Sequence, residues 1–187
     1  MNTTFPSTID LQNRFHLECL RLSLVPTVHY LIISIAAQEL YYYTNNSLIK
    51  TYIISTSEHP PSCQQNSFGT PWGMHKIAEK HGDNADCGTV FKGRKSINQK
   101  YWECSVDFQN DRLITSRILW LQGLEPSVNQ GTGIDSFERF IYIHGTNREH
   151  LIGSPVTLGC ITLKNQDIIA LYNLIPRESL VWIQKSV

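Results

Sequence analysis

The sequence predicts a mainly β domain, closer to a β-sandwich or an open barrel than to an α/β fold, with two or three short helices. Most of its apolar runs have the length of strands, are rich in β-branched and aromatic residues, and are separated by turn residues. Helical patterns with a capping residue occur in only two stretches, 8–22 and 165–174. At 187 residues the chain is long enough to bury the core of one domain.

The first helix can be capped by Thr8 or Asp10, and its apolar residues recur every four positions on one face. Pro26 ends this helical region and is followed by the first run of strand-forming residues. We therefore divide the chain into an N-terminal helical extension, residues 1–27, and a main domain, residues 28–187.

The main domain is predicted to contain strands at 28–35, 38–43, 48–55, 73–79, 88–92, 113–121, 140–144 and 180–184. Asn45-Asn46-Ser47 is a tight turn between the second and third of these strands. Residues 93–111 are polar and are expected to form a variable loop, with a possible strand from Trp102 to Phe108. Two further loops, 58–73 and 125–137, are longer than connection requires, and such loops are usually functional or disordered.

Composition excludes several classes of function. Lys plus Arg and Asp plus Glu both number 16, so the chain carries no charge imbalance typical of nucleic-acid binding. The most apolar stretch, 22–37, contains Pro26 and is shorter than the ~20 residues that span a bilayer. Met1-Asn-Thr-Thr4 is not a basic region followed by an apolar core, so no signal peptide is expected.

Five cysteines stand at positions 19, 63, 87, 104 and 160, and an odd number leaves at least one thiol free. A disulfide among the first four stays open at this point. His59 with Cys63, and His81 with Cys87, do not have the spacing of metal ligands, so no metal site is predicted.

The segment from Phe140 to Cys160 has the residues of a cysteine nucleophile and its base. A predicted strand ends at His144, a glycine follows, and Cys160 stands sixteen positions later behind Gly159. A thiolate nucleophile needs a base whose tautomer is fixed and N–H groups directed at the developing oxyanion. Gly145 lets its carbonyl approach the imidazole, and Gly159 permits a tight turn. These residues alone leave open whether the pair is catalytic or belongs to the core.

The order of motifs resembles that of the L,D-transpeptidase catalytic domain family. His144-Gly-Thr-Asn147, Ile152-Gly-Ser-Pro155 and Thr157-Leu-Gly-Cys-Ile161 are similar to the family's active-site signature at matching spacing. Thr70-Pro-Trp-Gly-Met-His-Lys-Ile77 is similar to another family element. The resemblance runs from about residue 28 to 184.

The resemblance implies a cysteine acyltransferase that acts on peptidoglycan stem peptides. Cys160 would attack the peptide carbonyl of the diamino acid at position 3, expel D-Ala and pass the acyl group to an amine. His144 would take the thiol proton, and the Gly145 carbonyl would orient His144. Backbone N–H groups around Leu158, Gly159 and Cys160 would form the oxyanion hole. No metal or cofactor is implied.

Further residues are assigned to substrate binding by the same resemblance. Thr157 occupies the family's Ser/Thr position, and Asn147 and Arg117 are candidate polar groups of the pocket. Leu158 stands where the family usually has His, and Thr162 where it usually has Arg, which a threonine cannot replace as a planar donor. These departures leave open an altered substrate or an impaired domain that only binds peptidoglycan. An L,D-carboxypeptidase with water as acceptor is a third reading.

We expect the Cys160 sulfur and a His144 ring nitrogen to lie near hydrogen-bond distance at the base of a cleft. The loops 58–73 and 125–137 are expected to form its walls, and His150 is a weaker candidate for contact with the substrate. The Cys160 pKa should lie below the ~8.5 of a free cysteine. The protein is expected to be a monomer in the cell envelope or periplasm.

Overall fold

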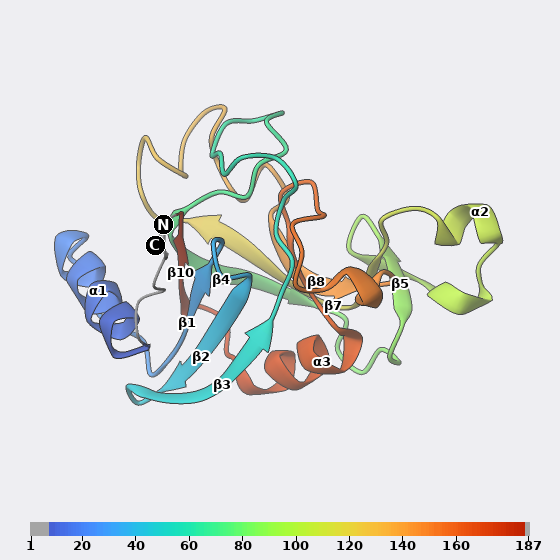
Figure 1. Cartoon of the computed structure of the whole chain (residues 1–187), viewed down its shortest axis with the longest axis horizontal. Coiled ribbons are helices and arrows are strands. Elements are labelled where there is room, and N and C mark those ends of the chain that lie inside the picture. The colour runs from blue at the N-terminus through green and yellow to red at the C-terminus, as the bar shows by residue number, and fades with distance from the viewer. Residues whose placement is uncertain (1–7, 186–187) are drawn as a thin grey trace, which may run out of the picture.

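The computed structural model describes residues 8–185 and is mainly β, as predicted (Figure 1). The strands of the described region are β1 (His29–Ser34), β2 (Glu39–Thr44), β3 (Ser47–Ile53), β4 (Gly73–His81), β5 (Thr89–Lys92), β6 (Lys95–Lys100), β7 (Ile114–Gly123), β8 (Tyr142–Thr146), β9 (Ile161–Leu163) and β10 (Leu180–Gln184). The α-helices are α1 (Thr8–Arg21), α2 (Val106–Gln109) and α3 (Asn165–Leu174), and short 3₁₀ turns are η1 (Tyr101–Glu103) and η2 (Glu149–Leu151).

All the described strands belong to one mixed sheet with the order β3-β2-β1-β10-β4-β7-β5-β6, and β8 and β9 continue from β7. The sheet can branch because β7 is long and bulged: its register shifts between Thr115 and Ile118. Ser116, inside the bulge, is fully buried with φ 65°. The bulge redirects β7, so that β4 pairs with its C-terminal half while β5 pairs with its start.

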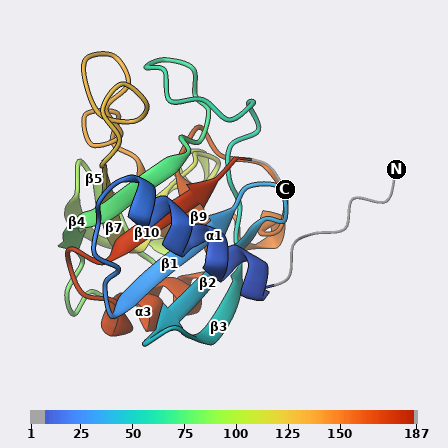
Figure 2. The ribbon, with the colours of Figure 1, turned by 90° about the vertical axis from the view of Figure 1, so that its left-hand side faces the viewer.

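The two faces of the sheet follow from alternation along its strands. Tyr30 and Ile32 of β1 pack against α1, whereas Leu31 and Ile33 point into the larger core that α3 helps to enclose. Figure 2 shows α1 lying across β1 and β10, and Figure 1 shows α3 below the sheet. The helical extension therefore packs on the sheet, while residues 1–7 of the predicted extension lie outside the described residues.

The two long loops lie side by side above the sheet in both ribbon views (Figures 1 and 2). A backbone hydrogen bond joins Gln65 N–H to the Gly133 carbonyl at 2.7 Å. Below them, the buried His75 of β4 is hydrogen-bonded to the Ser136 hydroxyl at 2.9 Å. The loops are therefore fixed to each other and to β4.

The prediction of a variable loop at 93–111, with a possible strand from Trp102 to Phe108, is wrong. Residues 95–100 form β6 and 106–109 form α2, with η1 between them. The Ser105 hydroxyl accepts a hydrogen bond from Phe108 N–H at 3.4 Å and caps α2, so the segment turns into a helix. Strand β9 was not predicted, because three residues between two turns give no readable alternation.

Within residues 8–185, no helix combines the length and the apolar character that a membrane crossing requires.

Candidate active site

Strands β8 and β9 place His144 beside the segment that carries Cys160. The two strands are parallel, with Ile143 paired to Ile161 and His144 to Thr162. Cys160 immediately precedes β9, and its Sγ accepts a hydrogen bond from Tyr142 N–H at 3.4 Å. Parallel pairing thus brings together two residues that are sixteen positions apart in the chain.

His144 and Cys160 line the same cavity, which has a volume of about 200 Å³. Its remaining lining residues are Arg112, Leu113, Ile114, Thr146, Arg148, Ile152, Val156, Thr157, Leu158 and Thr162. Apolar walls therefore surround a small set of polar groups, an arrangement typical of ligand sites.

His144 is held in one tautomer. Its Nδ1 lies 2.7 Å from the Gly145 carbonyl, and because a carbonyl can only accept, Nδ1 carries the proton. Nε2 of the neutral ring is then an acceptor. Burial lowers the pKa of His144 to about 4, while the Gly145 carbonyl opposes that shift. At neutral pH the imidazole is uncharged and can take a proton.

Close packing is a second reason why residue 145 is a glycine, and the sequence did not reveal it. A Cβ at this position would lie 2.6 Å from both the Asn165 Oδ1 and the Thr115 carbonyl. The Asn165 Oδ1 also accepts hydrogen bonds from the Thr115 and Ser116 hydroxyls, each at 2.6 Å. The glycine thus lets β8 press against the start of α3 and the bulge of β7.

The Cys160 thiol is protonated at rest. Its Sγ donates to the Phe140 carbonyl at 3.5 Å, and no hydrogen bond among the described residues joins it to His144. Burial raises the pKa of Cys160 to about 11, outweighing the Tyr142 N–H bond that lowers it. The prediction of a pKa below that of a free cysteine is therefore wrong for the resting site, because desolvation disfavours the thiolate.

The turn before Cys160 is organised by Thr157 and Gly159. The Thr157 hydroxyl donates to the Cys160 carbonyl at 2.6 Å and accepts from Gly159 N–H at 3.3 Å. Gly159 has φ +118°, a conformation that residues with a Cβ rarely adopt. The tight turn expected at Gly159 is present, and it presents the Cys160 sulfur to the cavity.

Both positions that depart from the family pattern line the cavity. Leu158 is 45% exposed at its mouth. Thr162 is buried on β9, and its N–H donates to the Ser55 carbonyl at 2.8 Å. The threonine therefore forms part of the cavity wall.

Asn147 and Arg117 lie outside this cavity. Asn147 holds the segment before β7, accepting from Leu113 N–H at 3.0 Å and donating to the Gln109 carbonyl at 2.7 Å. Arg117 donates to the Ala85 carbonyl at 2.6 Å and lies over the Tyr172 ring. Both side chains are engaged in packing, a use that the sequence could not distinguish from substrate binding.

The long loops do not form the walls of the cavity, contrary to expectation. Its lining residues come from 112–114, 144–148 and 152–162. A neighbouring hollow beyond Leu158 is lined by the loop residues Gln65, Asn66 and Phe68 and by 138–141. His150 is exposed and contributes to neither hollow.

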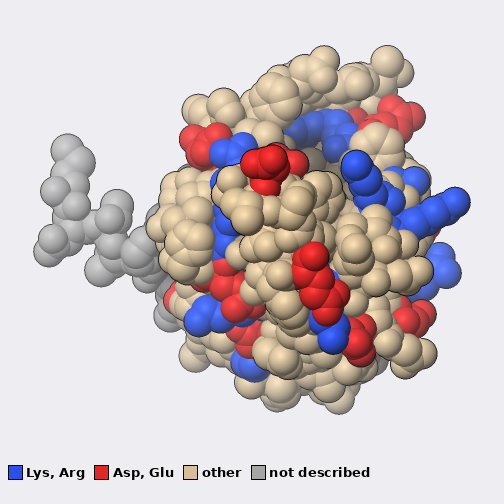
Figure 3. All heavy atoms as spheres, turned by 90° about the vertical axis from the view of Figure 1, so that its right-hand side faces the viewer, with Lys and Arg blue, Asp and Glu red and all other residues tan. Residues whose placement is uncertain are grey.

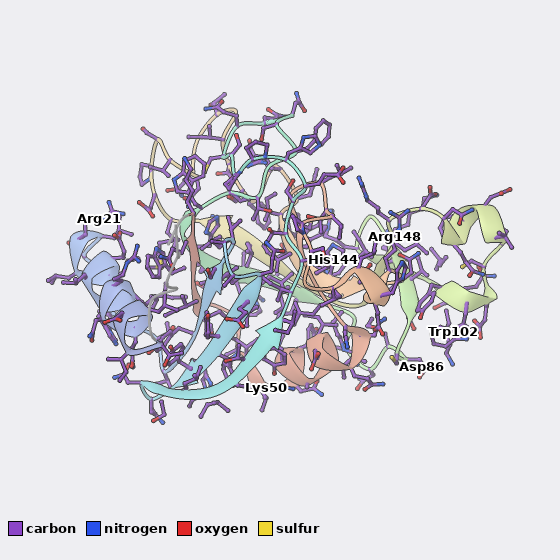
Figure 4. All side chains as sticks on the ribbon, viewed as in Figure 1. Arg21, Lys50, Asp86, Trp102, His144 and Arg148 are labelled. Atoms are coloured by element: carbon purple, nitrogen blue, oxygen red, sulfur yellow. The ribbon has the colours of Figure 1, made fainter. Side chains whose placement is uncertain are left out.

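Two arginines at the cavity were missed by the sequence analysis. Arg112 donates to both carboxylate oxygens of Glu58, at 2.9 and 3.0 Å, and Arg148 donates to the Asn110 carbonyl. Figure 4 shows Arg148 near His144, far from Arg21 on α1. Figure 3 shows basic side chains gathered beside a hollow on this end of the molecule. Arg148 directly follows the His144-Gly-Thr-Asn147 run, so its position in the sequence could have indicated that it lies at the cavity.

No metal-binding group of three or more His, Cys, Asp or Glu side chains occurs in the described part of the chain. All five cysteines are free thiols, so none of the first four forms a disulfide here.

Comparison with solved structures finds the same fold. An L,D-transpeptidase from Xylanimonas cellulosilytica has a TM-score of 0.53 at 12% identity, covering 86% of this chain and 62% of that one. L,D-transpeptidase 3 from Mycobacterium tuberculosis, in complex with a faropenem-derived adduct, has a TM-score of 0.52 at 13% identity, covering 84% of this chain and 60% of that one. An L,D-transpeptidase from Mycobacterium smegmatis has a TM-score of 0.51 at 12% identity, covering 84% of this chain and 58% of that one. The chain thus spans about 60% of the length of these structures.

A comparison with curated proteins gives no significant match. Residues 28–183, most of the chain, match the L,D-transpeptidase catalytic domain. The chain belongs to the L,D-transpeptidase catalytic domain family.

Proposed function

We propose that this protein is a cysteine acyltransferase that forms a thioester with a peptidoglycan stem peptide and transfers it to an amine. The observation that carries the proposal is the cavity shared by Cys160 and His144, with the His144 tautomer fixed by the Gly145 carbonyl. The family acts on peptidoglycan, which supplies the substrate class.

The first half-reaction makes the acyl-enzyme. As the Cys160 Sγ attacks the carbonyl carbon of the stem's third residue, its proton passes to Nε2 of His144. The carbonyl oxygen becomes an oxyanion, for which the backbone N–H groups of Leu158 and Cys160 are the proposed donors, because the Gly159 N–H expected from the sequence donates to the Thr157 hydroxyl. The C–N bond to D-Ala then breaks, and His144 returns the proton to the leaving amine.

The second half-reaction reverses these roles with a new amine. The acceptor nitrogen attacks the thioester carbonyl and gives a proton to His144. The C–S bond breaks, and the proton returns to the Cys160 sulfur, which regenerates the thiol. With water as acceptor the product is a tripeptide, the reaction of an L,D-carboxypeptidase.

Substrate binding is assigned to the cavity wall. Thr157, Leu158 and Thr162 line the space next to the sulfur. Thr162 supplies no guanidinium there, and Arg112, which also lines the cavity, is paired with the Glu58 carboxylate. Arg148 donates to a backbone carbonyl, so a carboxylate of a stem peptide is a suitable partner for its charge.

Incubation with a tetrapeptide stem tests the proposal. A crosslinked dimer with release of D-Ala is the expected result, read by mass spectrometry. A tripeptide alone would reassign the protein as a carboxypeptidase. Binding without any product would instead indicate a domain that only binds peptidoglycan.

We also propose a cell-envelope location, since the family's substrate lies there, and a monomeric state. Fractionation of the native cells and size-exclusion chromatography with light scattering test these two points. A protein confined to the cytosolic fraction would contradict the first, and a stable dimer the second.

A further inference from the structure

Arg139 is a half-buried cation without an acidic partner. Its Nη1 donates to the Ser62 carbonyl at 3.0 Å and its Nη2 to the Gly69 carbonyl at 2.8 Å. None of the ion pairs within residues 8–185 includes it. Burial lowers the pKa of Arg139, as expected for a charge that is removed from water without a counter-ion.

Arg139 stands next to the groups that hold Cys160. It precedes Phe140, whose carbonyl accepts the hydrogen bond from the Cys160 thiol. The Gly69 carbonyl that it holds lies 3.3 Å from the point where Gly159 would carry a Cβ. The guanidinium is thus anchored on the carbonyls of one long loop, on the side of Cys160 away from the His144 cavity.

The titratable groups around the Cys160 sulfur are few. His144 lines the cavity with it, and Tyr142 donates its N–H to it while its hydroxyl accepts from Arg94 at 3.1 Å. The positive charge of Arg139 lowers the pKa of Cys160, against the larger effect of burial. No ion pair within residues 8–185 includes Arg139, and its charge lowers the pKa of both Cys160 and the buried Cys63, which is not a residue of the cavity.

We propose that Arg139 is a positioning residue whose charge balances the anion that develops at Cys160 when the thiol loses its proton to His144. The inference rests on the proposed function and adds a third side chain to it. The Phe140 carbonyl holds the resting thiol, His144 removes the proton, and Arg139 stabilises the sulfur that remains. The same guanidinium fixes the 58–73 loop against the turn at Gly159.

Alkylation of Cys160 by two reagents of similar size, neutral iodoacetamide and anionic iodoacetate, tests this inference. Rates are measured by peptide mass spectrometry at Cys160 in the wild type, Arg139→Gln, Arg139→Lys and Arg177→Gln. Arg177 is a matched control, because it also donates to a backbone carbonyl, that of Ala78 at 2.9 Å, but is exposed and lines neither hollow. Thermal unfolding of each variant reports whether it is folded.

We expect Arg139→Gln to slow both reagents several-fold at pH 8, because loss of the nearby positive charge lowers the fraction of Cys160 that is thiolate. The ratio of the iodoacetate rate to the iodoacetamide rate should also fall several-fold. Arg139→Lys, which keeps the charge and loses the planar fork, should restore the ratio, and Arg177→Gln should not change it. A role limited to holding the loop would change both rates equally and would not be rescued by lysine.

The outcomes separate this inference from the proposed function. An unchanged rate ratio in folded Arg139→Gln, with Cys160 reactive, overturns the inference alone. A Cys160 that does not react with either reagent in the folded wild type overturns this inference, because no anion then forms at the sulfur, and the proposed function falls with it only if a tetrapeptide stem also gives no product.

Discussion

The Cys160 thiol and the His144 imidazole are both neutral at rest, because burial raises one pKa to about 11 and lowers the other to about 4. Proton transfer within the empty site would create two charges in buried surroundings. In the proposed reaction this cost is offset by the positive charge of Arg139, which lowers the Cys160 pKa, and by movement of the negative charge to an oxyanion as the sulfur bonds to the substrate carbon. We therefore expect a thiolate at Cys160 to be short-lived.

A β-lactam of the penem or carbapenem class should acylate Cys160 alone and add one drug mass to the protein. Cys160→Ala should abolish the adduct, and His144→Ala should slow its formation by ~10²–10⁴-fold, the usual contribution of a general base. Intact-protein mass spectrometry over time measures both. Cys104→Ala, which removes a thiol outside the cavity, is the control. Unimpaired acylation of Cys160→Ala would assign the nucleophile elsewhere.

The motif around His144 and Cys160 could be recognised in the sequence because its parts are close in the chain and have fixed spacing. The roles of Arg112 and Arg139 could not, since their partners, Glu58 and the Ser62 and Gly69 carbonyls, lie more than fifty positions away. The direction of the Cys160 pKa was also unreadable, because tertiary packing sets burial.

At the scale of elements, α1 is attached to the sheet by stacked aromatic rings. Phe15 stacks on Tyr30 with centroids 4.2 Å apart, and Tyr30 stacks on Tyr43 at 4.9 Å. Phe15 belongs to the apolar face that the sequence predicted for this helix from residues recurring every four positions. The sequence could not predict which strand would receive Phe15, because that depends on the order of strands in the sheet.

Phe15→Ala should lower the free energy of unfolding by about 3–5 kcal/mol, the usual cost of a cavity left by a buried phenylalanine. Leu17→Ala on the same helix should change it by less than about 0.5 kcal/mol, since Leu17 is 63% exposed. Urea unfolding followed by circular dichroism measures both variants. Equal losses would show that α1 does not depend on its aromatic contact.

Most strands were predicted because alternation and turn residues mark them, whereas β6, β9 and α2 were missed. Strand β9 has three residues and is a strand only because β8 lies beside it. Helix α2 has four residues and depends on its Ser105 cap rather than on an apolar face. Elements this short are decided by contacts that are distant in sequence.

At the scale of the whole molecule, two buried histidines make stability depend on pH. Burial lowers the pKa of both His75 and His144 from 6.5 to about 4. Between pH 4 and pH 6.5 the two imidazole rings are protonated in the unfolded chain but stay neutral in the folded chain. The stability from the neutral rings is therefore complete above pH 6.5 and is lost as the pH falls toward 4.

We expect acidification from pH 7 to pH 4 to lower the free energy of unfolding by on the order of 3 kcal/mol for each histidine. His75→Asn should reduce this pH dependence, whereas the exposed His150→Asn should leave it unchanged. Urea unfolding at several pH values provides the comparison. If the free energy of unfolding depended on pH no more steeply in the wild type than in His75→Asn, His75 would not contribute to the pH dependence.

The neutral resting state of Cys160 has a consequence for chemical durability. The thiolate form of cysteine attacks peroxides and disulfides far faster than the thiol does. A sulfur that stays protonated at neutral pH is therefore a poor target for oxidants, even though it lies at the edge of an open cavity. We therefore expect the burial that raises the Cys160 pKa to slow irreversible oxidation of this thiol as well.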